Sequence, residues 1–177
     1  MEVIGTVGLP GSGKGEFANV ARDLGVPVVT MGDVIREECR KRGLDPADHH
    51  GEVARSLREE HGPLAVAERS IPMVREALDD ADTVLVDGLR SAEELERFRA
   101  AFGDAFTLVA VEAPFEARAE RIDARARDNT AAETLRDRDE RELGFGMGEA
   151  MERADRRIEN DDSLAAFREQ VRKVMDA

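Results

Sequence analysis

The residues with the clearest chemistry form a glycine-rich loop, residues 8–16, which reads GLPGSGKGE. The loop lies between an apolar run typical of a β-strand and a helical pattern. Glycines let a backbone turn its N–H groups around an anion, and the following helix adds the positive end of its dipole. Lys14 supplies a mobile positive charge. We therefore predict that the loop binds nucleotide phosphates, with Gly8, Leu9, Pro10, Gly11, Ser12, Gly13, Lys14, Gly15 and Glu16 as the binding residues.

Two residues depart from the general pattern G-x-x-x-x-G-K-[ST]. Gly15 replaces the hydroxyl residue that normally contributes to magnesium binding, and an acid, Glu16, follows it. Magnesium keeps several waters, so a water could take the place of the hydroxyl. Asp87 ends an apolar run and is our candidate to hold such a water. Glu16 should repel phosphates unless it points away or joins the water shell of the metal.

The elements that must position these residues alternate between strands and helices. Apolar runs predict strands at residues 3–7, 26–30, 84–86 and 106–111, with a weaker one at 157–159. Helical patterns predict helices at 15–24, 34–42, 46–60, 64–78 (with Pro72 as a kink or boundary), 91–103, after Pro114, from a Thr130–Glu133 capping box, and from Ser163 to Met175. This alternation predicts an α/β fold with a mostly parallel sheet. Ligands bind such sheets at the carboxyl ends of the strands.

Several stretches resemble P-loop nucleotide kinases. GLPGSGKG is similar to the loop of adenylate kinases, and VTMGDVIR (29–36) and VLVDGLR (84–90) resemble the adenylate kinase segments that follow strands two and three, with the proline of the second one absent. ERIDARARD (120–128) and ADRRIENDDSLAAFREQV (154–171) are more similar to dephospho-coenzyme A kinase. The whole chain resembles an uncharacterised archaeal family of P-loop nucleotide kinases that combines these features.

The resemblance implies a three-layer P-loop fold with a five-stranded parallel sheet in the order 2-3-1-4-5 and a short helical lid. Residues 1–177 would form a single domain, with a core at 1–30, 80–120 and 154–177, an acceptor-binding helical region at 31–79 and a lid region at 121–150. In kinases of this group the lid carries arginines that close over ATP. The lid candidates here are Arg121, Arg127, Arg138 and Arg141.

The same resemblance assigns an acceptor site. A kinase that transfers phosphate between two anions must neutralise both, and the guanidinium fork of arginine suits that task. The matching positions predict Gly32, Asp33, Arg36, Asp87, Gly88 and Arg90 as substrate-binding residues. The predicted catalytic set is Lys14, Arg36, Asp87, Arg90, Arg127 and Arg138.

Composition narrows the class of protein. Charged residues make up 37% of the chain, the net charge is −13, and all but three of the 26 basic residues are arginine. This acidity argues against strong nucleic-acid binding and is typical of a halophile. Cys39 is the only cysteine, no apolar run approaches the roughly 20 residues of a membrane span, and no signal peptide is expected. We expect a soluble cytoplasmic protein, either a monomer or a homodimer, that does not bind membranes.

The function that we predict is transfer of phosphate from ATP, with Mg²⁺, to a nucleotide-type acceptor. Two alternatives stay open at this point. The acceptor group could be a hydroxyl, as in dephospho-coenzyme A, in which case Asp33 matters more as a base. The chain could also be a slow ATPase module that acts on a protein or ribonucleoprotein partner. His49, His50 and His61 are interpreted as surface residues or as part of the acceptor pocket, because adjacent histidines on a helix diverge.

Overall fold

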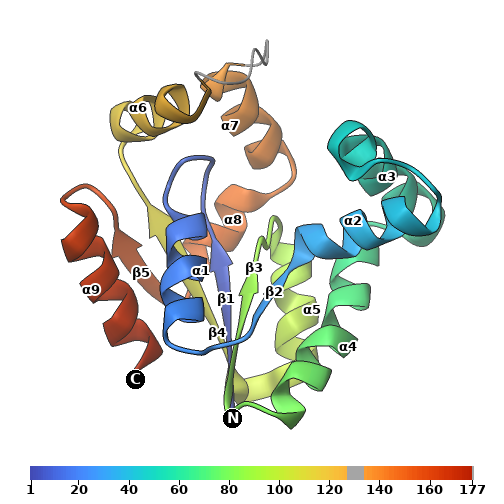
Figure 1. Ribbon diagram of the computed structural model, residues 1–177, viewed down its shortest axis with the longest axis horizontal. Coiled ribbons are helices and arrows are strands. Elements are labelled where there is room, and N and C mark those ends of the chain that lie inside the picture. Colours follow the sequence, from blue (N-terminus) through green and yellow to red (C-terminus); the bar gives the residue numbers. More distant parts are fainter. Residues whose placement is uncertain (127–133, 177) are drawn as a thin grey trace.

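The computed structural model describes residues 1–126 and 134–176. Within these residues the strands form one parallel sheet of five strands in the order β2-β3-β1-β4-β5 (Figure 1). The strands are β1 (Glu2–Val7), β2 (Val28–Thr30), β3 (Thr83–Asp87), β4 (Phe106–Glu112) and β5 (Arg156–Glu159). The predicted fold class and strand order are therefore confirmed.

Helices cover both faces of the sheet, because alternate residues of the central strands are buried on opposite sides. Val3 and Val7 of β1 belong to one core cluster and Ile4 belongs to the other. The side of Ile4 is covered by α1 (Lys14–Asp23) and α9 (Leu164–Met175), as Figure 1 shows. The side of Val3 is covered by α4 (Ala65–Asp79), α5 (Ala92–Phe102), which leads into a short 3-10 turn (Gly103–Ala105), and α8 (Met147–Glu152).

The remaining helices follow the carboxyl ends of the strands. Helices α2 (Met31–Lys41) and α3 (Pro46–His61) come after β2, and α6 (Phe115–Ala126) and α7 (Leu135–Gly144) come after β4. Figure 1 shows α6 and α7 on one side of the loop between β1 and α1, and α2 and α3 on the other side. The sequences that were predicted to bind ligands thus lie at one edge of the sheet.

Two element boundaries differ from the sequence predictions, and a third prediction lies outside the described residues. Helix α2 begins at Met31, directly after β2, and not at residue 34. Helix α4 continues through Pro72, so this proline is not a boundary. The predicted cap Thr130 lies outside the described residues. In the described part of the chain, α7 begins with a capping box made by Thr134 and Asp137.

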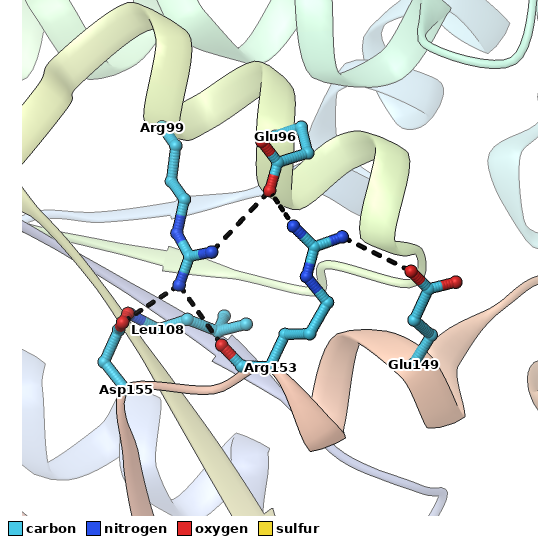
Figure 2. A network of polar contacts seen from close by, with 6 residues as sticks. All are labelled: Glu96, Arg99, Leu108, Glu149, Arg153 and Asp155. Atoms are coloured by element: carbon cyan, nitrogen blue, oxygen red, sulfur yellow. Dashed lines mark hydrogen bonds and ion pairs between the residues drawn. The ribbon is translucent and has the colours of Figure 1, made fainter.

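A network of ionic contacts ties α5 to the segment that connects α8 to β5 (Figure 2). Arg99 Nη2 donates to Asp155 Oδ1 at 2.9 Å and to the carbonyl of Arg153 at 3.1 Å. Asp155 Oδ2 also accepts from the backbone N–H of Leu108 on β4 at 2.8 Å. Figure 2 shows the Arg153 guanidinium reaching both Glu96 and Glu149. These contacts fix α8, the end of the predicted lid region, to the core.

Within the described residues, no helix combines the length and the apolar character needed to cross a membrane.

Candidate active site

The glycine-rich loop leads into α1 through a residue that must be glycine. Gly13 occupies the N-cap position with φ 120°, in the left-handed region, and a Cβ there would collide with the side-chain amide of Asn160. Within the described residues, no side chain caps α1. The first N–H groups of any α-helix have no intrahelical acceptor. Because no described side chain caps those of α1, they are available for an anion at the helix N-terminus.

Lys14 is the first residue of α1 and lines the cavity next to the loop. Its Nζ donates to the carbonyl of Gly8 at 2.5 Å and lies 3.4 Å from that of Leu9. Burial lowers the pKa of Lys14, whereas the nearby carboxylates of Asp87 and Glu142 oppose this shift. A desolvated ammonium that donates to carbonyls gains from an anionic partner, so Lys14 suits the role that the sequence predicts.

Buried polar contacts brace the loop from α6 and from the turn after β5. Arg118, only 5% exposed, donates to the carbonyl of Pro10 at 3.1 Å and forms a two-pronged ion pair with Asp139 of α7, both contacts at 2.8 Å. Arg121 donates to the carbonyls of Gly11 at 3.2 Å and Asn160 at 2.8 Å. The Asn160 side chain donates to the carbonyl of Ser12 at 2.8 Å. The loop is therefore held in shape before a ligand arrives.

Asp87 ends β3 beside the loop and is oriented by Thr6. The two residues are register partners on β3 and β1, and the buried Thr6 hydroxyl donates to Asp87 Oδ1 at 2.8 Å. Asp87 also lines the cavity beside the loop. Sequence reasoning missed Thr6, because its role depends on the strand register.

A single cavity of about 610 Å³ joins the loop to the predicted acceptor residues. Gly32 and Arg36 of α2 and Asp87, Gly88 and Arg90 after β3 all line this cavity. Asp33 differs, since it is not among the described residues that line the cavity and instead pairs with Arg36 at 2.5 Å. The structure thus brings together every predicted substrate-binding residue except Asp33.

Three further ionisable residues line the acceptor side of the cavity: His50, Arg58 and Glu94. The sequence predicted His50 as a surface residue or as part of the acceptor pocket, and it did not predict Arg58 or Glu94 as substrate-binding residues. Glu94 is 3% exposed, and one of its oxygens accepts from the backbone N–H of Arg90 at 2.8 Å. Burial raises the pKa of Glu94, and the backbone of Arg90 opposes this shift. The Ser91 hydroxyl accepts from the backbone N–H of Glu94 at 3.1 Å and caps α5, whereas the Glu94 carboxylate reaches back to the N–H of Arg90.

Helix α7, in the predicted lid region, contributes Arg138, Arg141 and Glu142 to the cavity lining. Glu142 is buried, and its Oε1 lies 3.6 Å from Arg90 Nη1. Its Oε2 has no hydrogen-bond partner among the described residues. Arg127, a predicted catalytic residue, lies outside the described residues.

Four other residues of the loop, Leu9, Ser12, Gly15 and Glu16, differ in their surroundings. Ser12 is 1% exposed, and Leu9 packs against the core. A Cβ at Gly15 would meet no described atom within 4 Å, so space does not explain this glycine. The Glu16 side chain points to Arg168 of α9, and Glu16 is not among the described residues that line the cavity.

Comparisons with known proteins agree with this architecture. A family model described as an AAA domain matches residues 7–136. A UPF0200 protein from Halobacterium salinarum is 58% identical, over 100% of this chain and 94% of its own length. The structure is also similar to that of TT1252 from Thermus thermophilus (TM-score 0.66, 22% identity, 99% of this chain and 96% of that chain). A shikimate kinase from Acinetobacter baumannii, solved with shikimate, gives a TM-score of 0.59 at 20% identity, over 99% and 92% of the two chains.

The identities to the solved structures are low, so these two likenesses establish the fold alone, which the chain shares with TT1252 and with a shikimate kinase. The relatives in sequence establish the family and include a halophile. The expected membership in an archaeal family with this fold is confirmed. The chain belongs to the UPF0200 family, and its residues 7–136 match an AAA domain.

Proposed function

We propose that this protein transfers the terminal phosphoryl group of ATP to a small nucleotide-type acceptor. One observation carries the proposal: the phosphate loop, with Lys14, and the arginines Arg36 and Arg90 line the same cavity. Two anions can therefore meet in one space whose walls supply positive charge for both, which is the main requirement of phosphoryl transfer.

The residues of the loop fit the phosphates of ATP. The uncapped start of α1 offers N–H groups, and Lys14 can exchange its loop carbonyls for phosphate oxygens. Mg²⁺, when bound, neutralises charge on the phosphates, and Asp87 is placed to hold one of its waters. Within the described residues, no group of three or more His, Cys, Asp or Glu side chains could hold a metal. The metal would therefore depend mainly on phosphates and water.

The acceptor would lie between α2 and the turn after β3. Arg36 and Arg90 would bind its anionic group from two sides and hold the attacking oxygen in line with the phosphorus of the transferred group. That oxygen forms the new bond to phosphorus as the bond to the ADP oxygen breaks. A phosphate acceptor is already ionised, so it needs no strong base. The lid region, residues 121–150, would supply Arg138 and Arg141 to the transferring group.

Transfer to a hydroxyl group is the second candidate, and for this reaction the observed contacts favour Asp87 over Asp33 as the base. Asp33 is paired with Arg36 and is not among the described residues that line the cavity. Asp87 lines the cavity and is oriented by Thr6, so it is the better placed carboxylate to accept a proton from a hydroxyl.

A coupled assay of ADP formation tests the proposed function. Mg-ATP is supplied with AMP, CMP, UMP or dephospho-coenzyme A, in molar potassium chloride to suit the acidic chain. We expect ADP formation that depends on one acceptor of the panel. Slow hydrolysis at the same rate with every acceptor would contradict the kinase proposal and favour an ATPase module. Arg36→Ala should then raise KM for the acceptor by at least about tenfold and leave KM for ATP nearly unchanged.

A further inference from the structure

Three arginines from three separate elements line the acceptor side of the cavity. Arg36 comes from α2, Arg58 from α3 and Arg90 from the turn after β3. Positive charges that are brought close together repel one another, so such an arrangement costs stability unless anions compensate it. Arg36 has Asp33 at 2.5 Å, and Arg90 has Glu142 at 3.6 Å.

Arg58 is the member of this group whose charge has no direct partner. Within the described residues, no carboxylate lies within ion-pair distance of its guanidinium, and the hydrogen bond that it makes runs from Nη1 to the carbonyl of Ala54, on its own helix, at 3.2 Å. Burial lowers the pKa of Arg58, and the charge of Glu94 opposes this shift without a direct contact. The guanidinium is therefore partly desolvated, and most of its donors remain unused beside a cavity.

His50, also on α3, marks where the three arginines converge. Burial lowers its pKa, and the charges of Arg36, Arg90 and Arg58 all lower it further, against a hydrogen bond with the backbone of Gly32. A Cβ built on Gly32 would lie 3.5 Å from Arg36 Nη1 and 3.6 Å from His50 Nε2, so both side chains reach this part of α2. One imidazole thus lies within the electrostatic reach of all three guanidinium groups.

We propose that Arg58 and His50 complete an anion subsite with Arg36 and Arg90, and that this subsite selects acceptors that carry a phosphate group. The proposal rests on the proposed function, since it specifies which group of the acceptor is bound. Guanidinium groups present parallel N–H donors that match the oxygens of phosphate, and three of them from different directions suit a tetrahedral dianion better than a planar carboxylate. Arg58 would distinguish a phosphorylated acceptor from its unphosphorylated form.

The test measures binding of inorganic phosphate to protein that is already saturated with the ATP analogue AMP-PNP and Mg²⁺, by isothermal titration calorimetry. We expect wild-type protein to bind phosphate more tightly than acetate. Arg58→Ala should weaken phosphate binding at least about tenfold, because a charge-assisted contact is lost. Arg55→Ala is the matched control, since Arg55 is an exposed arginine on the same helix and does not line the cavity among the described residues. It should bind phosphate as the wild type does.

Arg58→Lys extends the test if Arg58→Ala does not fold, because lysine keeps the charge and loses the fork of donors. It should weaken phosphate binding by about threefold to tenfold. Equal phosphate affinity in the Arg58 variants and the wild type, absence of phosphate binding by the wild type, or preference for acetate would overturn the proposal. Failure of AMP-PNP itself to bind would instead contradict the proposed function, so the two failures are distinguishable.

Discussion

Glu16 Oε1 lies 2.6 Å from Arg168 Nε, and this ion pair joins the first turn of α1 to α9. An acid in a phosphate-binding loop should repel the phosphates unless its side chain is directed elsewhere, and this contact shows where the Glu16 side chain is directed. The carboxylate points away from the cavity, and its charge is balanced by a guanidinium from the other end of the chain. Any contact of Glu16 with a phosphate would then involve its backbone N–H and not its side chain.

A double-mutant cycle on Glu16→Gln and Arg168→Ala tests this interpretation. The pair is partly exposed, so we expect a coupling free energy of unfolding of about 0.2–1 kcal/mol, smaller in high salt. Urea unfolding of the four proteins measures the coupling. ATP affinity should change by less than about twofold in Arg168→Ala. A large loss of ATP affinity in Arg168→Ala would show that the pair shapes the nucleotide site.

Lys14→Met should separate ligand binding from folding. The Lys14 ammonium is desolvated, as its lowered pKa indicates, so its removal should leave the melting temperature unchanged or raise it. The affinity for ATP should fall at least about tenfold, because the mobile charge for the phosphates is lost. Lys41→Met is the control, since Lys41 is exposed and pairs with Glu37 on α2. If Lys14→Met binds ATP as Lys41→Met does, the loop does not bind phosphates through this lysine.

The pair of Arg118 and Asp139 should contribute strongly to stability, because the Arg118 side chain is buried and the pair joins α6 to α7. Asp139→Ala leaves the Arg118 guanidinium buried without its carboxylate, and we expect the free energy of unfolding to fall by about 3 kcal/mol. Glu149→Ala removes one contact of an exposed pair with Arg153 and should cost less than about 1 kcal/mol. Equal costs in urea unfolding would contradict the role of Asp139 as the partner of the buried Arg118.

The titration of His50 should report on the acceptor side of the cavity. Its pKa lies below the ordinary 6.5 because of burial and the nearby arginines. The unfolded chain therefore binds a proton at His50 at a higher pH than the folded protein does. As the pH falls below about 6.5 and through the folded pKa, protonation favours the unfolded chain, so the contribution of His50 to the free energy of unfolding is lost.

NMR titration of the His50 ring, assigned with His50→Asn, should give a midpoint below 6.5 in the free protein. Binding of inorganic phosphate should raise that midpoint, since an anion beside the imidazole favours its charged form. A midpoint that does not move when phosphate binds would place the phosphate away from His50.

The sequence was sufficient to predict the residues that local patterns determine. The loop from Gly8 to Lys14, Asp87 at a strand end and the buried strands all follow from glycine spacing and apolar runs. The strand order needed the resemblance to known kinases, because spacing alone does not say which parallel strands are neighbours. Pro72 was predicted as a kink or a boundary, and the boundary is wrong because α4 continues through the proline, which burial of Ile71 and Val74 on either side favours.

The residues that the sequence did not reveal act through tertiary contacts. Arg58 is one of many arginines, and only the packing of α3 places it beside Arg90 and Glu94. Thr6 is an ordinary strand residue until the register of β1 and β3 sets it opposite Asp87. Glu142 belongs to a helix of alternating charges, where solvent exposure is the expected state, yet it is buried in the cavity wall.

The most direct test of the central claim follows the label from [γ-³²P]ATP in molar potassium chloride with the acceptor that supports turnover. We expect the label to appear in the phosphorylated acceptor in equal amount to the ADP formed, and Lys14→Met to abolish the transfer. Label that appears only as inorganic phosphate, at a rate that the acceptor does not change, would contradict the central claim.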